Sequence, residues 1–155
     1  MLPLDYLYQD TITLFNRRVV SGTYEWHATV LRGVHFIVQR GLIVATYGES
    51  STDNAQLNVR YTKQGNEIVI QDKVYVMPME WRRLSEDEIA DHITFTGGEE
   101  FDFIYGGVWD GDKVVYDDEF DSGFFNYMNS NYDEVFAITN VSQFNFIPHF
   151  EITAK

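Results

Sequence analysis

TYEWHATVLRGVHFIV, residues 23–38, is the stretch of sequence that decides the fold. Aromatic and aliphatic side chains occupy every second position from Tyr24 to Val30, and polar side chains stand between them. This period of two predicts a β-strand with one buried face. The pair Arg32-Gly33 is a turn signal, and the alternation resumes at residues 34–38. We therefore expect two strands here, joined by a turn.

Similar short runs extend the strand prediction over most of the chain. Alternating or apolar runs lie at residues 8–15, 57–61, 68–70, 74–76, 93–95, 101–105, 135–138 and 144–152. Turn residues separate them, most clearly in the loop at 47–54, and Pro78 is expected to end a hairpin built from 68–70 and 74–76. Residues 8–15 and the two strands of the quoted stretch should form an antiparallel meander.

Two short helices are expected among the strands. Residues 85–88, Ser-Glu-Asp-Glu, have the spacing of a capping box and predict a helix that reaches about Ala90. Residues 122–132 place Phe124, Tyr127 and Met128 at helical spacing. With about eight to ten short strands at regular turn spacing, we expect a mainly β single domain over residues 1–155, either a barrel or a sandwich.

Composition excludes several classes of protein. The 155-residue chain contains no cysteine, which excludes disulfides, thiolate metal sites and cysteine nucleophiles. Residues 1–5 lack the basic start and apolar core of a signal peptide. The longest apolar runs, 42–45 and 74–77, are too short to span a bilayer. We expect the chain to fold in the cytoplasm without contacting a membrane.

The charge of the chain is distributed unevenly. Residues 1–83 carry 9 Lys/Arg and 8 Asp/Glu, a net +1, whereas residues 84–155 carry 2 and 16, a net −14, and together these give the total of −13. An acidic half of this kind repels phosphate, so tight or sequence-specific nucleic-acid binding is not expected. The acidic half is either a solvated face that keeps the protein soluble or a surface that lies beside a polyanion without binding it.

Acidic residues form the densest candidate site. Nine of them crowd into 23 residues: Glu99, Glu100, Asp102, Asp110, Asp112, Asp117, Asp118, Glu119 and Asp121. A pair of them could act as general acid and base, as in a glycosidase, but spacing along the chain does not show that. Residues 110–114 lack the ligand pattern of a helix–loop–helix calcium site. We expect a solvated acidic face and leave a weak divalent-ion site open.

Histidines and nucleophile motifs give no stronger signal. His27, His35, His92 and His149 show no metal-ligand spacing, and we expect them to be hydrogen-bonded structural residues. The sequence contains neither a Gly-x-Ser-x-Gly motif nor a phosphate-binding loop. We therefore assign no catalytic, cofactor-binding or metal-ligating residue, expect no cofactor, and predict that the chain is not an enzyme.

Aromatic residues are the other excess, at 16% of the chain. One group of them lies in a region rich in asparagine: Phe120, Phe124, Phe125, Tyr127 and Tyr132. These side chains form either a platform on which a sugar or another ligand stacks, or a helix packed over an open barrel end. Packing is the interpretation we prefer.

Four stretches of the sequence resemble a family of uncharacterised proteins from tailed phages and prophages of Firmicutes. They are residues 48–55 (GESSTDNA), 76–81 (VMPMEW), 133–139 (DEVFAIT) and 147–152 (IPHFEI). Residues 10–17, DTITLFNR, also resemble the opening strand of small phage head–tail connector proteins. None of these stretches is a known active site, so the resemblance transfers no site residue.

The resemblance implies a minor structural protein of the bacteriophage virion. Its architectural model is the head-closure, or stopper, protein, a small β-barrel that forms a ring below the portal and adaptor during head completion. The expected partners are other copies of the chain in a ring oligomer and the neighbouring portal, adaptor or tail proteins. The chain would be assembled in the host cytoplasm and would lie near DNA without binding it specifically. The excess of aromatic residues in the chain also suits interfaces between subunits.

Two other classes of function stay open at this stage. The first is a module that binds carbohydrate or peptide through exposed aromatic residues such as Trp109, Phe124, Phe125 or Tyr127. The second is a hydrolase that uses paired carboxylates from residues 99–121. Burial of the aromatic side chains would count against the first, and scattered carboxylates would count against the second.

Overall fold

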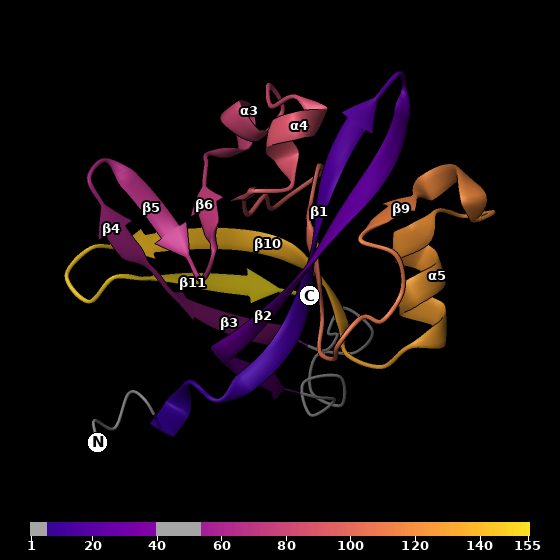
Figure 1. The fold of residues 1–155 in the computed structure, drawn as a ribbon. Coiled ribbons are helices and arrows are strands. Elements are labelled where there is room, and N and C mark those ends of the chain that lie inside the picture. The colour runs from indigo at the N-terminus through magenta and orange to yellow at the C-terminus, as the bar shows by residue number, and fades with distance from the viewer. Residues whose placement is uncertain (1–5, 40–53) are drawn as a thin grey trace.

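A six-stranded closed β-barrel is the centre of the computed structural model, which describes residues 6–39 and 54–155 (Figure 1). Around the barrel the strands follow the order β1-β2-β3-β11-β10-β8, and β1 closes it by pairing with both β2 and β8. The barrel strands are β1 (Asp10–Val20), β2 (Thr23–Gln39), β3 (Asn54–Arg60), β8 (Phe103–Tyr105), β10 (Val135–Phe144) and β11 (His149–Ala154). The prediction of a mainly β barrel or sandwich is confirmed, and the structure is the barrel.

Two sequence predictions fall where the structure describes little or nothing. The loop expected at 47–54 lies outside the described residues, except for Asn54, which begins β3. The apolar run at 42–45 also lies outside them.

The stretch that decides the fold forms one long strand rather than two. β1 and β2 pair from Asp10 opposite Val34 to Val20 opposite Thr23, and the expected turn at Arg32-Gly33 is therefore wrong. Gly33 has a φ of 66°, and the register shifts beside it, between Asp10 and Thr11. Glycine in the left-handed region absorbs the irregularity as a bulge, so the strand bends without reversing.

The far edge of β2 is divided between two partners. Glu25 to His27 pair with β9 (Val114–Tyr116), and His35 to Gln39 pair with β3. The turn end of the β1–β2 hairpin therefore extends beyond the barrel (Figure 1). A second apolar cluster, which includes Phe15 and Trp26, packs on this part of the hairpin.

The part of the chain between β3 and β8 forms a small second sheet. It contains β4 (Thr62–Gln64), β5 (Glu67–Ile70), β6 (Lys73–Tyr75) and β7 (His92–Ile93), and the predicted hairpin is its β5–β6 pair. Two helices, α3 (Pro78–Trp81) and α4 (Glu86–Ile89), connect β6 to β7. α4 is the predicted capping-box helix, and the Ser85 N–H donates a hydrogen bond to Glu88 at 3.0 Å. α3 was not predicted; proline is well placed in a first helical turn because no hydrogen bond is lost there.

Two apolar clusters lie on opposite faces of β1. Ile12 and Leu14 belong to the barrel interior, whereas Phe15 belongs to a second cluster with Phe103 and Phe124. Five consecutive residues of β1, from Ile12 to Asn16, are buried because both faces of the strand are covered.

The second cluster is closed by the predicted 122–132 helix, which is α5 (Phe124–Asn131). A short 3-10 helix, η2 (Asp117–Glu119), precedes it. Among the helices of residues 6–39 and 54–155, none is long and apolar enough to cross a membrane.

Candidate interaction surface

Asp102 lies in the interior and does not belong to an acidic face. Its exposed fraction is 1%, and its carboxylate accepts hydrogen bonds from the Arg17 N–H at 2.7 Å, the Thr96 N–H at 2.8 Å and the Asn16 side-chain amide at 2.9 Å. Its own carbonyl accepts a bond from the Ile138 N–H at 2.9 Å. Asp102 thus links β1, residues 94–96 and β10. The expectation that all nine acidic residues are solvated is wrong for this one.

Burial raises the pKa of Asp102 to about 7, although the three hydrogen bonds and the charge of Arg17 favour the ionised form. The buried Asn16 Oδ1 accepts no hydrogen bond from the described protein atoms. The Asn16 Nδ2 donates to the Thr94 carbonyl at 2.6 Å as well as to Asp102, so turning the amide over would place its oxygen against that carbonyl. The Asn16 amide is therefore fixed with its nitrogen toward both acceptors.

The fold should lose stability as the pH rises through neutrality. Between roughly pH 4 and pH 7 the folded chain retains a proton on Asp102 that the unfolded chain has released, so a rising pH favours unfolding. From pH 5 to pH 8 this group should lower the free energy of unfolding by about 2.5 kcal/mol. Urea denaturation at pH 5 and at pH 8 measures this difference in the free energy of unfolding. Asp102→Asn should remove the part of the pH dependence that comes from this group. Equal slopes in the two proteins would show that Asp102 titrates normally.

The other acidic residues do not form a common site. Seven of them are exposed: Glu99, Glu100, Asp110, Asp112, Asp118, Glu119 and Asp121. Glu100 pairs with Arg82 on the surface. Asp117 is half-buried, and its Oδ1 accepts hydrogen bonds from Trp26 Nε1 at 2.9 Å and from the Phe124 N–H at 2.8 Å. Asp117 therefore attaches the start of α5 to β2, a role that its sequence context does not reveal.

Each of the four histidines makes a structural hydrogen bond, as expected. His27 Nε2 lies 2.9 Å from Glu25 Oε1, and burial lowers the pKa of His27 despite that carboxylate. His35 meets the Asn58 amide at 3.3 Å, His92 meets the Glu88 carbonyl at 2.7 Å, and His149 meets Glu151 at 2.9 Å. Within residues 6–39 and 54–155, no three histidine, aspartate or glutamate side chains come together as they would around a metal ion.

Packing accounts for most of the aromatic group that was a candidate platform. Phe124 is fully buried, with ring centroids 5.2 Å from Phe15 and 5.5 Å from Trp109. Phe120 and Phe125 pack against the same cluster, whereas Tyr127 and Tyr132 are 39% and 38% exposed. Packing, the interpretation we prefer, fits these contacts, but the helix packs on the outer face of β1 and not over an open barrel end.

The turn between β10 and β11 is the most exposed apolar feature of the described chain. Residues 144–148, Phe-Asn-Phe-Ile-Pro, form what we call the apolar tip. Phe146 is 96% exposed, and Phe144 and Ile147 are 42% and 48% exposed. The strand run predicted at 144–152 is wrong at its start, because the chain reverses at 145–148 between β10 and β11. Exposure of this kind is typical of contact with another molecule.

The apolar tip is held firmly at its base. The Tyr61 hydroxyl lies 2.8 Å from the Phe144 carbonyl, to which it donates, and 2.6 Å from Asn145 Oδ1. The Tyr61 N–H donates to the Pro148 carbonyl at 3.2 Å. Phe144 also stacks on the ring of His149, with centroids 4.9 Å apart. A tip fixed in this way loses little conformational entropy when it binds.

A groove lies beside α5, at the opposite end of β10. Its lining, which we call the α5–β10 groove, is Phe101, Phe125, Asn129, Tyr132, Asp133, Glu134, Val135, Phe136, Ala137 and Lys155, and its volume is about 500 Å³. Phe101 and Phe125 meet edge to face with centroids 4.8 Å apart. Gly106 lies so close to Glu134 that a Cβ at this position would stand 2.5 Å from its Oε1 and 2.9 Å from its Cβ, so a larger residue there would have to displace Glu134. Aromatic walls with an acidic rim suit a half-apolar ligand.

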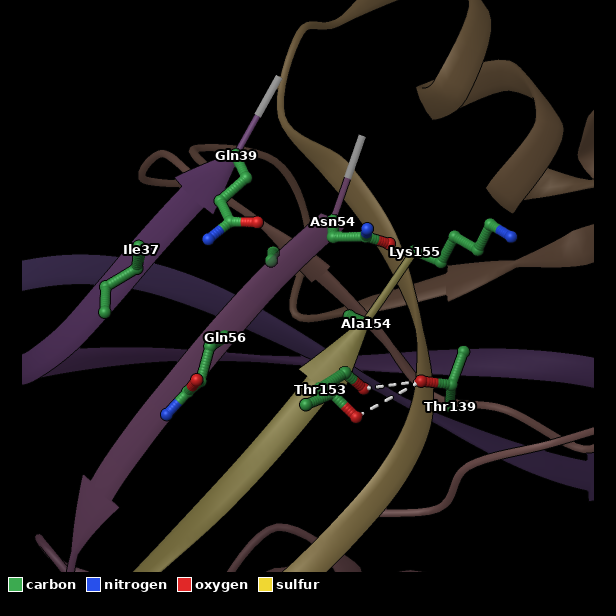
Figure 2. Close-up of a pocket in the computed structure, with 9 residues that line it drawn as sticks. Ile37, Gln39, Asn54, Gln56, Thr139, Thr153, Ala154 and Lys155 are labelled. Atoms are coloured by element: carbon green, nitrogen blue, oxygen red, sulfur yellow. Dashed lines mark hydrogen bonds between the residues drawn. The ribbon is translucent and has the colours of Figure 1, made fainter. Parts of the chain in front are cut away.

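A second pocket opens where β2 and β11 end and β3 begins (Figure 2). Gln39, Asn54, Gln56, Thr139 and Thr153 contribute uncharged polar groups. The Thr139 hydroxyl donates to the Thr153 carbonyl at 3.1 Å. The chain between Gln39 and Asn54 lies outside the described residues, so we assign no site to this pocket.

Comparison with known proteins identifies one family. Residues 7–155 match the model of a family of unknown function, DUF6751. No curated protein and no solved structure matches the chain. The resemblance to phage connector proteins therefore stays a prediction, and the geometry of the chain has to support any function.

Proposed function

The chain belongs to the DUF6751 family, and from its own structure we propose that it is a non-catalytic subunit of the head–tail connector of a tailed phage. In this proposal it forms part of a ring near the head-closure position and contacts portal, adaptor or tail proteins. The observation that carries the proposal is the apolar tip, a rigid turn that presents an almost fully exposed phenylalanine.

Exposed apolar groups also occur at other projecting parts of the structure. Val19 is 60% exposed near the end of the β1–β2 hairpin, and Met77 and Met79 are 63% and 62% exposed at the start of α3. A small barrel that displays apolar side chains on hairpins and connecting segments suits a protein with several neighbours. This arrangement supports a structural subunit better than it supports a catalyst with one concave site.

The acidic half supports a position near DNA. Asp110, Asp112, Asp118 and Glu119 are exposed, and residues 84–112 contain no Lys or Arg. A lining of carboxylates repels the phosphates of a passing duplex and lets it slide. Asp117 does not belong to this surface because it is bound to Trp26.

The isolated protein should not bind duplex DNA even at low salt. Binding through phosphates requires several cations, which the acidic half lacks, so we expect no shift in a gel assay at about 50 mM salt, where such contacts are strongest. Replacing Asp110, Asp112, Asp118 and Glu119 by lysine should leave the fold intact, since each exposed change costs less than about 0.5 kcal/mol. In a phage, these changes should slow DNA packaging or ejection. Tight binding by the wild-type protein would contradict an acidic channel lining.

Deleting the gene in a lysogen that carries it tests the proposed function. We expect induced cells to contain DNA-filled heads and separate tails in electron micrographs, and complementation to restore joined virions. A tagged copy should also be detected in purified virions by mass spectrometry. Normal infectious virions from the deletion strain would rule the proposal out.

A further inference from the structure

We infer that the chain associates head to tail with a second copy of itself, with the apolar tip of one copy seated in the α5–β10 groove of the next. The inference deepens the proposed function, because it names the contact that would join neighbouring subunits of a ring. It rests on the shape, the charge and the position of the two surfaces.

The shapes of the two surfaces match. The tip presents Phe146 and Ile147 outward from a base fixed by Tyr61. The groove, at about 500 Å³, is large enough for both side chains, and Phe101 and Phe125 offer it aromatic walls. An aromatic anchor that enters an aromatic-lined pocket is the usual centre of a protein interface.

The charges are complementary as well. Residues 135–150, which include the tip, contain no Asp, Glu, Lys or Arg, although the half of the chain around them has a net charge of −14. The rim of the groove carries Asp133 and Glu134 together with Lys155, so acidic side chains outnumber basic ones there. Arg60, opposite His149 on β3, adjoins the base of the tip. An uncharged tip with a cation at its base can approach a mainly acidic rim, whereas two acidic faces would repel each other.

The positions of the two surfaces determine the kind of assembly. The groove includes Val135 to Ala137 at the start of β10, and the tip begins at Phe144 at its end, about 23 Å further along the strand. A copy therefore uses one patch to bind the other patch of its neighbour, which is a heterologous contact. Such contacts close into rings or continue as filaments, and do not stop at a two-fold dimer.

The contact is small, so the affinity should be low. The tip would bury roughly 400 Å² on its side, judged from the size of aromatic side chains, which places the interface at the lower end of specific interfaces. We expect a monomer at micromolar concentration and association that rises towards millimolar. The crowded neck of a virion would hold such subunits together more firmly.

Complementation between two variants tests the inference. Phe146→Asp removes the tip, and Asn129→Trp fills the groove from an exposed position on α5. In sedimentation velocity up to 1 mM, each variant alone should stay monomeric, and their equimolar mixture should give a 1:1 dimer and nothing larger, because only one tip and one groove stay intact. Val19→Asp, which changes another exposed apolar residue away from both surfaces, should associate like the wild type.

The outcomes distinguish this contact from the alternatives. A wild type that stays monomeric at 1 mM, a Phe146→Asp protein that associates like the wild type, or a mixture without the dimer would each overturn the inference. Self-association with no phage role, shown by normal virions in the deletion strain, would leave the contact standing and remove the connector function. Connector defects in the deletion strain, without self-association of the purified protein, would remove the contact and leave the connector function standing.

Discussion

Replacing Asp102 by alanine is expected to lower the free energy of unfolding by about 3–5 kcal/mol, because it leaves several buried donors unpaired. The Arg17 N–H, the Thr96 N–H and the Asn16 amide all donate to this carboxylate, which is 1% exposed. No other acceptor can replace it without moving β1 or residues 94–96. Urea denaturation at constant pH, followed by tryptophan fluorescence, measures the loss.

Asp118→Ala is the matched control for this change. It removes an exposed carboxylate from the same acidic stretch, so the free energy of unfolding should change by less than about 0.5 kcal/mol. If the two alanine variants were equally stable, the buried network would contribute nothing to the fold.

Replacing Phe124 by alanine is expected to cost about 3–5 kcal/mol and to detach α5 from the barrel. Phe124 is fully buried, and its ring meets Phe15, Phe103, Trp109 and Phe120 at centroid distances of 5.1–5.8 Å. The cavity left by the ring cannot collapse easily because these neighbours are themselves held by strands. Thermal unfolding measures the loss, and the groove beside α5 should lose its shape with it.

Tyr127→Ala is the control on the same helix. Its ring is 39% exposed, so its removal should cost no more than about 1 kcal/mol and should leave self-association unchanged. A Phe124→Ala protein that is as stable as this control would show that α5 is attached by something other than the aromatic cluster.

Local sequence patterns predicted the strands and the helix that starts after Ser85. The alternation of Tyr24 to Val30 gave the strand but not its buried face, since Tyr24 is 39% exposed and Thr29 is buried. Ser85 with Glu88 gave the correct helix start. Gly33 misled the prediction because a glycine with positive φ serves a bulge as well as a turn, and only the pairing of β1 with β2 decides between them. Closure of the barrel could not be predicted from local patterns either, because it depends on the pairing of β1 with β8, about ninety residues away in the sequence.

The candidate surface was harder to predict than the fold. Asp102 looks like its acidic neighbours in the sequence, and its burial depends on donors from β1 and residues 94–96. Phe146 follows the same even spacing as Phe150, and only the reversal of the chain before Pro148 separates the exposed ring from the buried one. A signal was present for the tip, however: Asn145 and Pro148 are turn residues inside an apolar run.

Closure of the barrel has a consequence for aggregation. A sheet with free edges offers unpaired main-chain groups to other chains, which is hazardous in a protein with so many aromatic residues. In the described part of the chain, each barrel strand has a partner strand on both sides, and the strands at sheet edges are short, with three residues in β4 and β9 and two in β7. β4 reads Thr-Lys-Gln and is exposed throughout, so the edge it offers is polar and charged. Few unpaired main-chain groups are therefore available for amyloid-like stacking. Contacts between copies have to be made by side chains, and such contacts can be specific and reversible.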